Sequence, residues 1–269
     1  MKKIVALLLG ILLFIPVVSL SGCIGTEENA QPQESPAKPT TKNRQEVVNV
    51  EGKDLKTLIK NYKEYRKDYY EKNKDLFTKL AEEGQKPKVL FITCSDSRVV
   101  PSIITKSDPG DLFVLRIIGN FVPPYEFALE YSGVASAIEY ATSVLEVEHI
   151  IICGHTECGA CAALYQNLPD DPEMIAIKKW LKVAEPVKKY VLKQIKNDKV
   201  DKKKLLELTE KTSIKFQIRN LLTYPGIKRR VENKKLSIHG WYLNIGNGKI
   251  EYYDLEKDTF IPLELYQEY

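Results

Sequence analysis

The sequence predicts an α/β fold in which helices flank a mostly parallel central sheet. Three short apolar runs, residues 88–93, 112–117 and 149–153, have the length and continuous hydrophobicity of strands that are buried on both faces. The segment 126–145, between the second and third runs, has helical spacing and contains no proline. Alternation of strands and helices is typical of a parallel sheet, because parallel strands need a long crossover connection.

An amphipathic helix is expected before the first strand. Apolar residues recur there at three- and four-residue steps between lysines, from Leu55 to about Glu83. Gly84 and Pro87 follow, and both are typical of a helix end. This segment should form an N-terminal helical arm.

The second half of the chain predicts two more helices and a C-terminal hairpin strand. Residues 172–197 and 202–224 have helical patterns, and Pro186 should bend the first of them. Two strands, 235–241 and 249–254, are then joined through Gly246-Asn247-Gly248, which is a strong hairpin-turn signal.

The start of the chain has the composition of a secretory signal peptide. Two lysines precede the almost wholly apolar residues 4–20, and small residues follow. Leu20-Ser21-Gly22-Cys23 resembles the lipobox of secreted lipoproteins, in which the cysteine thiol is acylated and the cysteine becomes the new N-terminus after cleavage. The resemblance implies a signal peptide at residues 1–22 and an extracytoplasmic protein anchored to the membrane by lipid on Cys23. An uncleaved membrane-spanning helix over residues 4–20 is the alternative.

Residues 23–49 are expected to be a flexible linker and residues 50–269 the folded domain. Residues 25–49 are rich in Pro, Thr, Gln and Asn and hold almost no large apolar side chain, so they cannot bury enough surface to fold. The whole chain is 43% hydrophobic and 28% charged, which is typical of a globular protein. Its net charge of +4, without a basic run interleaved with aromatic residues, argues against nucleic acid as a partner.

Two loops at the ends of predicted strands hold the residues best suited to chemistry. One is Cys94-Ser95-Asp96-Ser97-Arg98, and the other is Gly154-His155-Thr156-Glu157-Cys158-Gly159. Ligands of open α/β sheets bind beyond the carboxyl ends of the strands, near the point where the strand order reverses. A site shared by the two loops is therefore geometrically reasonable.

Cys94, His155 and Cys158 would offer zinc two thiolates and one imidazole. Three protein ligands leave the fourth tetrahedral position open for water, which is the pattern of catalytic zinc. Asp96 and Arg98 would add a carboxylate and its partner cation beside the metal.

The remaining cysteines allow other interpretations. Cys153 ends a strand of isoleucines and is expected to be a small buried hydrophobic residue. Cys158 and Cys161 have redox-pair spacing, or could join His155 in a different metal set. Both alternatives leave Cys94 and its charged neighbours unexplained.

The two loops resemble the first and second signatures of the β-carbonic anhydrases. Supporting matches are Pro109-Gly110-Asp111-Leu112-Phe113-Val114, Arg116, Gly119, Asn120, Ile138-Glu139-Tyr140 and Ile238-His239-Gly240-Trp241. The resemblance covers roughly residues 54–254.

This resemblance implies one Zn²⁺ per chain on Cys94, His155 and Cys158, with Asp96 and Arg98 as the catalytic dyad. In some members of the family the aspartate swings onto zinc in a closed state, so Asp96 is also a conditional metal ligand. The implied reaction is the reversible hydration of carbon dioxide to bicarbonate and a proton by zinc-bound hydroxide. The family's architecture further implies at least a homodimer, in which the N-terminal helix packs across the neighbouring subunit.

Two competing functions stay open at this stage. A related zinc hydrolase on the same scaffold would act on carbon disulfide or carbonyl sulfide. A non-catalytic, zinc-binding surface lipoprotein is the other candidate. A purely structural zinc needs neither Asp96 nor Arg98, so the sequence favours an enzyme.

Overall fold

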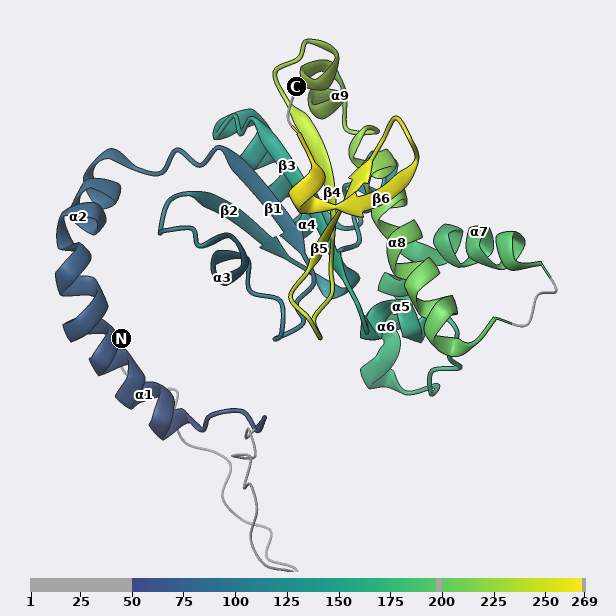
Figure 1. The fold of residues 1–269 in the computed structure, drawn as a ribbon, viewed down its shortest axis with the longest axis horizontal. Coiled ribbons are helices and arrows are strands. Elements are labelled where there is room, and N and C mark those ends of the chain that lie inside the picture. Colours follow the sequence, from purple (N-terminus) through teal and green to yellow (C-terminus); the bar gives the residue numbers. More distant parts are fainter. Residues whose placement is uncertain (1–49, 197–199, 268–269) are drawn as a thin grey trace, which may run out of the picture. The chain divides into compact units, whose positions relative to one another are not determined.

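The computed structural model describes residues 50–196 and 200–267, and Figure 1 shows their fold. The predicted signal peptide, Cys23 and the linker lie outside the described residues. Contacts divide the chain into two units, Met1–Asp54 and Leu55–Tyr269, and the second contains all the helices and strands discussed below. None of the helices in the described ranges is long and apolar enough to cross a membrane.

A six-stranded mixed sheet forms the centre of the second unit (Figure 1). Its strands lie in the order β2-β1-β3-β4-β5-β6, in which the first four are parallel and the last two antiparallel. The predicted mostly parallel sheet with a C-terminal hairpin is thereby confirmed. The strands are β1 (Val89–Thr93), β2 (Leu112–Arg116), β3 (His149–His155), β4 (Ser237–Leu243), β5 (Ile250–Asp254) and β6 (Thr259–Pro262).

The helices follow the predicted pattern, with more breaks. The helical arm runs from Leu55 to Glu83 through short π and 3-10 segments and ends at Gly84, whose positive φ of 78° suits glycine. The helix expected over residues 172–197 breaks directly before Pro186, which lies in the first turn of the second piece. The helices α3, α5 and α9 and the strand β6 were not predicted. The α-helices are α1 (Leu55–Glu64), α2 (Lys74–Glu83), α3 (Pro101–Thr105), α4 (Ser132–Glu139), α5 (Gly159–Ala163), α6 (Ile175–Leu181), α7 (Glu185–Ile195), α8 (Lys202–Leu221) and α9 (Pro225–Glu232).

Alternate side chains of β1 and β3 enter two different cores. Leu90 and Ile150 belong to a large core that also contains residues of α4, α8 and α9. Phe91 and Ile151 belong to a smaller core on the other face, together with side chains such as Ile104 of α3. Burial on both faces explains why these strands are continuous apolar runs in the sequence.

The strand order places the two signature loops side by side. Thr93, the last residue of β1, pairs with Arg116 of β2 on one side and with Cys153 of β3 on the other. The chain leaves β1 toward β2 and later returns to pair β3 with the opposite edge of β1, so the strand order reverses between β1 and β3. The loops after these two strands therefore meet at the switch point where α/β sheets bind ligands.

Candidate metal centre

Three side chains from the two signature loops converge on one point. The sulfur atoms of Cys94 and Cys158 and a ring nitrogen of His155 all lie within 4.8 Å of one another, and all three residues are buried. A zinc ion binds sulfur at about 2.3 Å, so two thiolates that share it lie less than about 4.6 Å apart. The three groups thus need little adjustment to hold one ion.

The hydrogen bonds of His155 leave one ring nitrogen available to a metal. Nδ1 lies 2.8 Å from the Thr156 carbonyl oxygen, which can only accept, so Nδ1 carries the proton and donates. Nε2 is buried and has no hydrogen-bond partner among the described residues. A buried, unpaired nitrogen lone pair is costly unless it binds something. A zinc ion between the two thiols would satisfy it, so the residues present fit the metal.

Cys94 is held from a second direction by the loop after β2. The Gly119 N–H donates to Cys94 Sγ at 3.3 Å. Gly119 has φ 70°, and a Cβ there would come within 2.6 Å of the Phe121 ring and 2.9 Å of Ala160. Only glycine can adopt this backbone in this space, which is the physical basis of the predicted match at this position.

Both thiols stay protonated when no metal is bound. The neighbouring Cys158 thiol and burial raise the pKa of Cys94 to about 12. The pKa of Cys158 is also raised, chiefly by its hydrogen bond with Cys161 and further by burial. A metal must displace these protons to bind, because the thiolate is the ligand.

Asp96 and Arg98 form a two-pronged ion pair beside the cluster. Arg98 Nε donates to Asp96 Oδ1 at 2.9 Å, and Arg98 Nη2 donates to Asp96 Oδ2 at 2.8 Å. The Arg98 guanidinium holds the pKa of Asp96 well below its usual range. Asp96 is not part of the three-residue cluster, and both of its carboxylate oxygens are directed to Arg98.

Arg98 also joins the two signature loops. Its Nη2 donates to the Glu157 carbonyl oxygen at 3.1 Å, two residues after the candidate metal ligand His155. Glu157 adopts a left-handed backbone, with φ 59°. This uncommon conformation for a non-glycine residue turns the chain between His155 and Cys158.

Arg116, Glu210 and Tyr242 also support the site, and the sequence assigned none of them a role. Arg116, one of the supporting matches to the family, donates to the Cys94 and Asp96 carbonyl oxygens at 3.2 and 2.6 Å. Glu210 accepts from the Cys158 N–H at 2.8 Å and from the Tyr242 hydroxyl at 2.6 Å. Burial raises the pKa of Glu210 to about 7. No sequence signal separates Glu210 from Glu207, the other glutamate of its helix.

The remaining cysteines lie as the favoured interpretation expects. Cys153 is fully buried in the core of the second sheet face. Cys161 is buried beside Cys158, but both are free thiols. In the described part of the chain, the set of Cys94, His155 and Cys158 is assembled and the set with Cys161 in place of Cys94 is not.

Comparison with known proteins agrees with this geometry. A family profile described as "Carbonic anhydrase" matches residues 89–250. A carbonic anhydrase from Synechocystis sp. is 39% identical over 200 residues, which cover 74% of this chain and 71% of that protein. One from Helicobacter pylori (strain J99) is 38% identical over 206 residues, which cover 75% and 91%.

Solved structures of β-carbonic anhydrases have the same fold as this chain. The β-carbonic anhydrase CcaA superposes with a TM-score of 0.73 at 37% identity, over 80% of this chain and 92% of that one. A tetrameric β-carbonic anhydrase from Sordaria macrospora gives 0.64 at 28% identity, over 73% and 95%. The family profile, the relatives and the cysteine–histidine–cysteine cluster at the switch point lead to one conclusion: the chain belongs to the β-carbonic anhydrase family.

Proposed function

We propose that Asp96 and Arg98 are the catalytic dyad of this zinc enzyme, and that Cys94, His155 and Cys158 hold its metal ion. The reaction of the enzyme is the reversible hydration of carbon dioxide to bicarbonate and a proton. The observation that carries the proposal is the two-pronged ion pair beside the metal-binding cluster. Neither residue is needed to hold a structural metal.

The chemistry divides between the metal and the dyad. Bound zinc acidifies a water molecule, so that attack on carbon dioxide is feasible near neutral pH. Asp96 is ionised under these conditions, because Arg98 lowers its pKa, and it can only accept hydrogen bonds. It would therefore accept from the O–H of the attacking oxygen and leave that oxygen's lone pair directed at the carbon.

Arg98 would keep Asp96 in this role. Its guanidinium binds both carboxylate oxygens, so the carboxylate cannot turn toward the metal without losing two charge-assisted hydrogen bonds. Its third bond, to the Glu157 carbonyl, ties the pair to the loop that supplies His155 and Cys158. The arginine thus acts on the reaction through Asp96.

The test is a stopped-flow assay of carbon dioxide hydration on zinc-loaded protein, with zinc content measured on the same samples. Carbonyl sulfide and carbon disulfide are tested as alternative substrates. We expect hydration of carbon dioxide well above the buffer background. Zinc-replete, folded protein that hydrolyses only the sulfur compounds would support the rival hydrolase, and protein inactive on all three would support the non-catalytic lipoprotein.

We also propose that the protein works outside the cytoplasm, anchored by lipid on Cys23. The support is Leu20-Ser21-Gly22-Cys23 directly after the apolar residues 4–20, followed by the polar residues 25–49 as a tether. Two acyl chains anchor a protein stably, whereas one does so only marginally.

Mass spectrometry of the mature N-terminus tests the anchor. We expect a chain that begins at Cys23 with acyl groups attached and that fractionates with membranes. Cys23→Ser should leave the chain unacylated and still beginning at Met1, whereas Ser21→Ala, which keeps a small residue before the cysteine, should leave acylation and cleavage unchanged. An unmodified Cys23, or a chain that still begins at Met1, contradicts the proposal.

We further propose that the chain forms a homodimer or a higher homo-oligomer. The helices α1 and α2 contain no buried residue, and the side chains of Leu58 and Tyr62 are 52% and 60% exposed. The edge strand β2 also exposes Val114. A second copy could cover these apolar surfaces, and the related enzyme from Sordaria macrospora is tetrameric.

Light scattering on the purified protein tests assembly. We expect at least a dimer at micromolar concentration and a shift toward monomer in Leu58→Glu. Lys56→Glu is the matched control, because it introduces the same side chain on the same helix outside the apolar set. A monomeric wild type contradicts the proposal.

A further inference from the structure

Glu210 is a buried carboxylate directly behind the metal centre. It lies on α8, is 2% exposed, and accepts from the Cys158 N–H at 2.8 Å and the Tyr242 hydroxyl at 2.6 Å. Among the described residues it takes part in no ion pair. Burying a carboxylate with only uncharged donors is costly, so its presence at this position requires an explanation.

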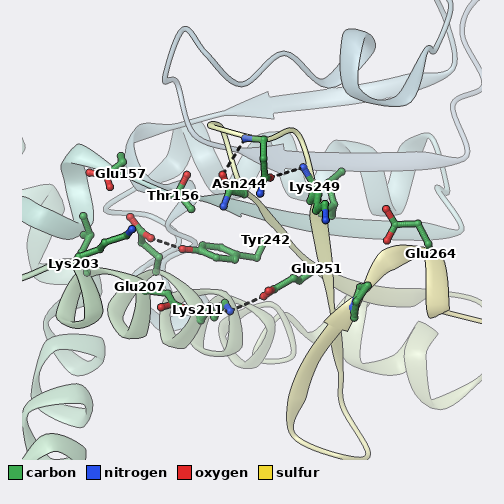
Figure 2. A pocket seen from close by; sticks show the side chains of 15 residues that line it. Thr156, Glu157, Lys203, Glu207, Lys211, Tyr242, Asn244, Lys249, Glu251 and Glu264 are labelled. Carbon is green, nitrogen blue, oxygen red and sulfur yellow. Dashed lines mark hydrogen bonds and ion pairs between the residues drawn. The ribbon is translucent and has the colours of Figure 1, made fainter. Parts of the chain in front are cut away.

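Glu210 lines a cavity together with Glu207 and Glu251, and these two glutamates form ion pairs with a lysine. The cavity has a volume of about 470 Å³ and lies between α8, the end of β4 and the loop that holds the second signature. Figure 2 shows Lys211 beside Glu251, and its Nζ lies 2.6 Å from that carboxylate and 3.1 Å from Glu207. Glu210 instead turns inward, between Tyr242 and the backbone of a metal ligand.

The bond to Cys158 restrains the position of the sulfur atom. Cys158 immediately precedes α5, and the N–H groups at a helix start have no partner within the helix. Glu210 supplies that partner. Because Cys158 Sγ is separated from the backbone by only the Cα–Cβ and Cβ–S bonds, an anchored backbone restricts the sulfur to the few positions that rotation about the Cα–Cβ bond allows.

Glu210 is itself held between two rigid elements. The helix α8 is 20 residues long and packs its apolar side into the large core, and Tyr242 of β4 is 4% exposed in the same core. The Tyr242 hydroxyl fixes the second carboxylate oxygen, so the carboxylate cannot rotate away from Cys158 without losing a bond.

Each proposed metal ligand then has an outer partner. The Gly119 N–H binds Cys94 Sγ, the Thr156 carbonyl binds His155 Nδ1, and Glu210 binds the Cys158 backbone. Outer partners of this kind orient metal ligands, and losing one typically lowers metal affinity or activity about 10- to 100-fold.

We propose that Glu210 is a positioning residue of the zinc site, which fixes Cys158 through its backbone N–H and is oriented by Tyr242. The proposal concerns how the metal is held. It is independent of the catalytic roles of Asp96 and Arg98, so its tests read the metal and not the reaction.

Glu210→Ala and Glu210→Gln separate the hydrogen bond from the charge. Alanine leaves the Cys158 N–H without its acceptor, and we expect zinc affinity in a chelator competition to fall about 10- to 100-fold. Glutamine keeps an acceptor for Cys158, and its amide can donate to the Tyr242 oxygen. Its zinc affinity should therefore stay close to that of the wild type. Glu207→Gln, one turn earlier on α8, is the control for loss of the same charge and should leave the affinity unchanged.

The absorption spectrum of the cobalt(II)-substituted protein reports ligand geometry directly. We expect the thiolate-to-cobalt bands to change in Glu210→Ala and to keep their wild-type form in Glu210→Gln and Glu207→Gln. A role in packing alone would lower the melting temperature of the alanine variant without changing this spectrum. Wild-type zinc affinity and cobalt spectrum in folded Glu210→Ala would overturn the proposal, as would a glutamine variant as weak as the alanine variant.

Tyr242→Phe keeps the proposal testable if the alanine variant does not fold. It removes a single hydroxyl and one of the two bonds to Glu210. The expected loss of zinc affinity is smaller, roughly 2- to 10-fold, as for one hydrogen bond. An unchanged affinity together with an unchanged cobalt spectrum in this variant rules out the orienting role of Tyr242, and with it the proposal as stated.

Discussion

Arg98→Ala tests whether the ion pair beside the metal controls the reaction. The substitution removes the two side-chain bonds from Arg98 to Asp96, at 2.9 and 2.8 Å, and the bond to the Glu157 carbonyl, and it keeps the bond from the backbone N–H of residue 98 to Asp96 Oδ1. It removes no proposed metal ligand. We therefore expect a large fall in the hydration rate with little change in zinc content.

The magnitude follows from the geometry and the exposure of the pair. A charge-assisted hydrogen bond contributes about 1.5–3 kcal/mol when it is sheltered. The Arg98 side chain is 48% exposed, so solvent screening reduces this to roughly 1 kcal/mol for each of the two bonds. The two bonds together favour the Arg98-bound orientation of Asp96 over the other orientations by about 2 kcal/mol, which corresponds to a population ratio of roughly 30. Without Arg98 the productive orientation of Asp96 loses that preference, and the rate should fall by about the same factor.

The assay is stopped-flow hydration of carbon dioxide, with the rate expressed per bound zinc. Arg98→Lys should recover little of the lost rate, because an ammonium cannot bind both carboxylate oxygens in the fork geometry of a guanidinium. Asp96→Asn should retain zinc and lose about 10²-fold in rate, as expected for a positioned acid–base group. Arg229→Ala, at an exposed position on α9, is the control. A zinc-replete Arg98→Ala protein with a rate within twofold of the wild type would falsify the proposed dyad.

The other predictions concern the metal and its supporting backbone. Cys94→Ala should lose zinc, whereas Cys161→Ala should retain it; full zinc occupancy of Cys94→Ala, measured by elemental analysis, would revive the alternative metal set. Zinc affinity should fall by about 10²-fold for each pH unit below neutrality. The raised pKa values keep both thiols protonated, and each proton that zinc must displace contributes about a tenfold change. Chelator competition at several pH values measures the slope, and an affinity that does not change with pH contradicts two thiolate ligands. Gly119→Ala should lower the free energy of unfolding by about 1–3 kcal/mol, because the new Cβ would collide with the Phe121 ring and because residue 119 has a positive φ. Denaturant unfolding tests this, and an unchanged midpoint contradicts the close packing.

Sequence patterns were most informative where the structure is local. The strands β1 and β3 are continuous apolar runs because both of their faces are buried, and the helical arm ends where Gly84 and Pro87 predict. Element boundaries were less predictable. The strand β6 and the helix α9 are short and were missed, and the helix after residue 172 breaks at Lys182–Ala184, just before Pro186.

The sequence by itself determined the metal-binding residue types and the place where they meet. Cysteine, histidine, aspartate and arginine lie at or shortly after the carboxyl ends of two buried strands, and parallel strands bring these ends to one edge of the sheet. Only the tertiary structure decided how these groups are held. Glu210 lies 52 residues after Cys158, on the helix α8, and its sequence neighbourhood resembles that of Glu207, the other glutamate of this helix. Which glutamate turns inward depends on how α8 packs against β3 and β4, so the outer partner of a metal ligand cannot be identified from residue spacing alone.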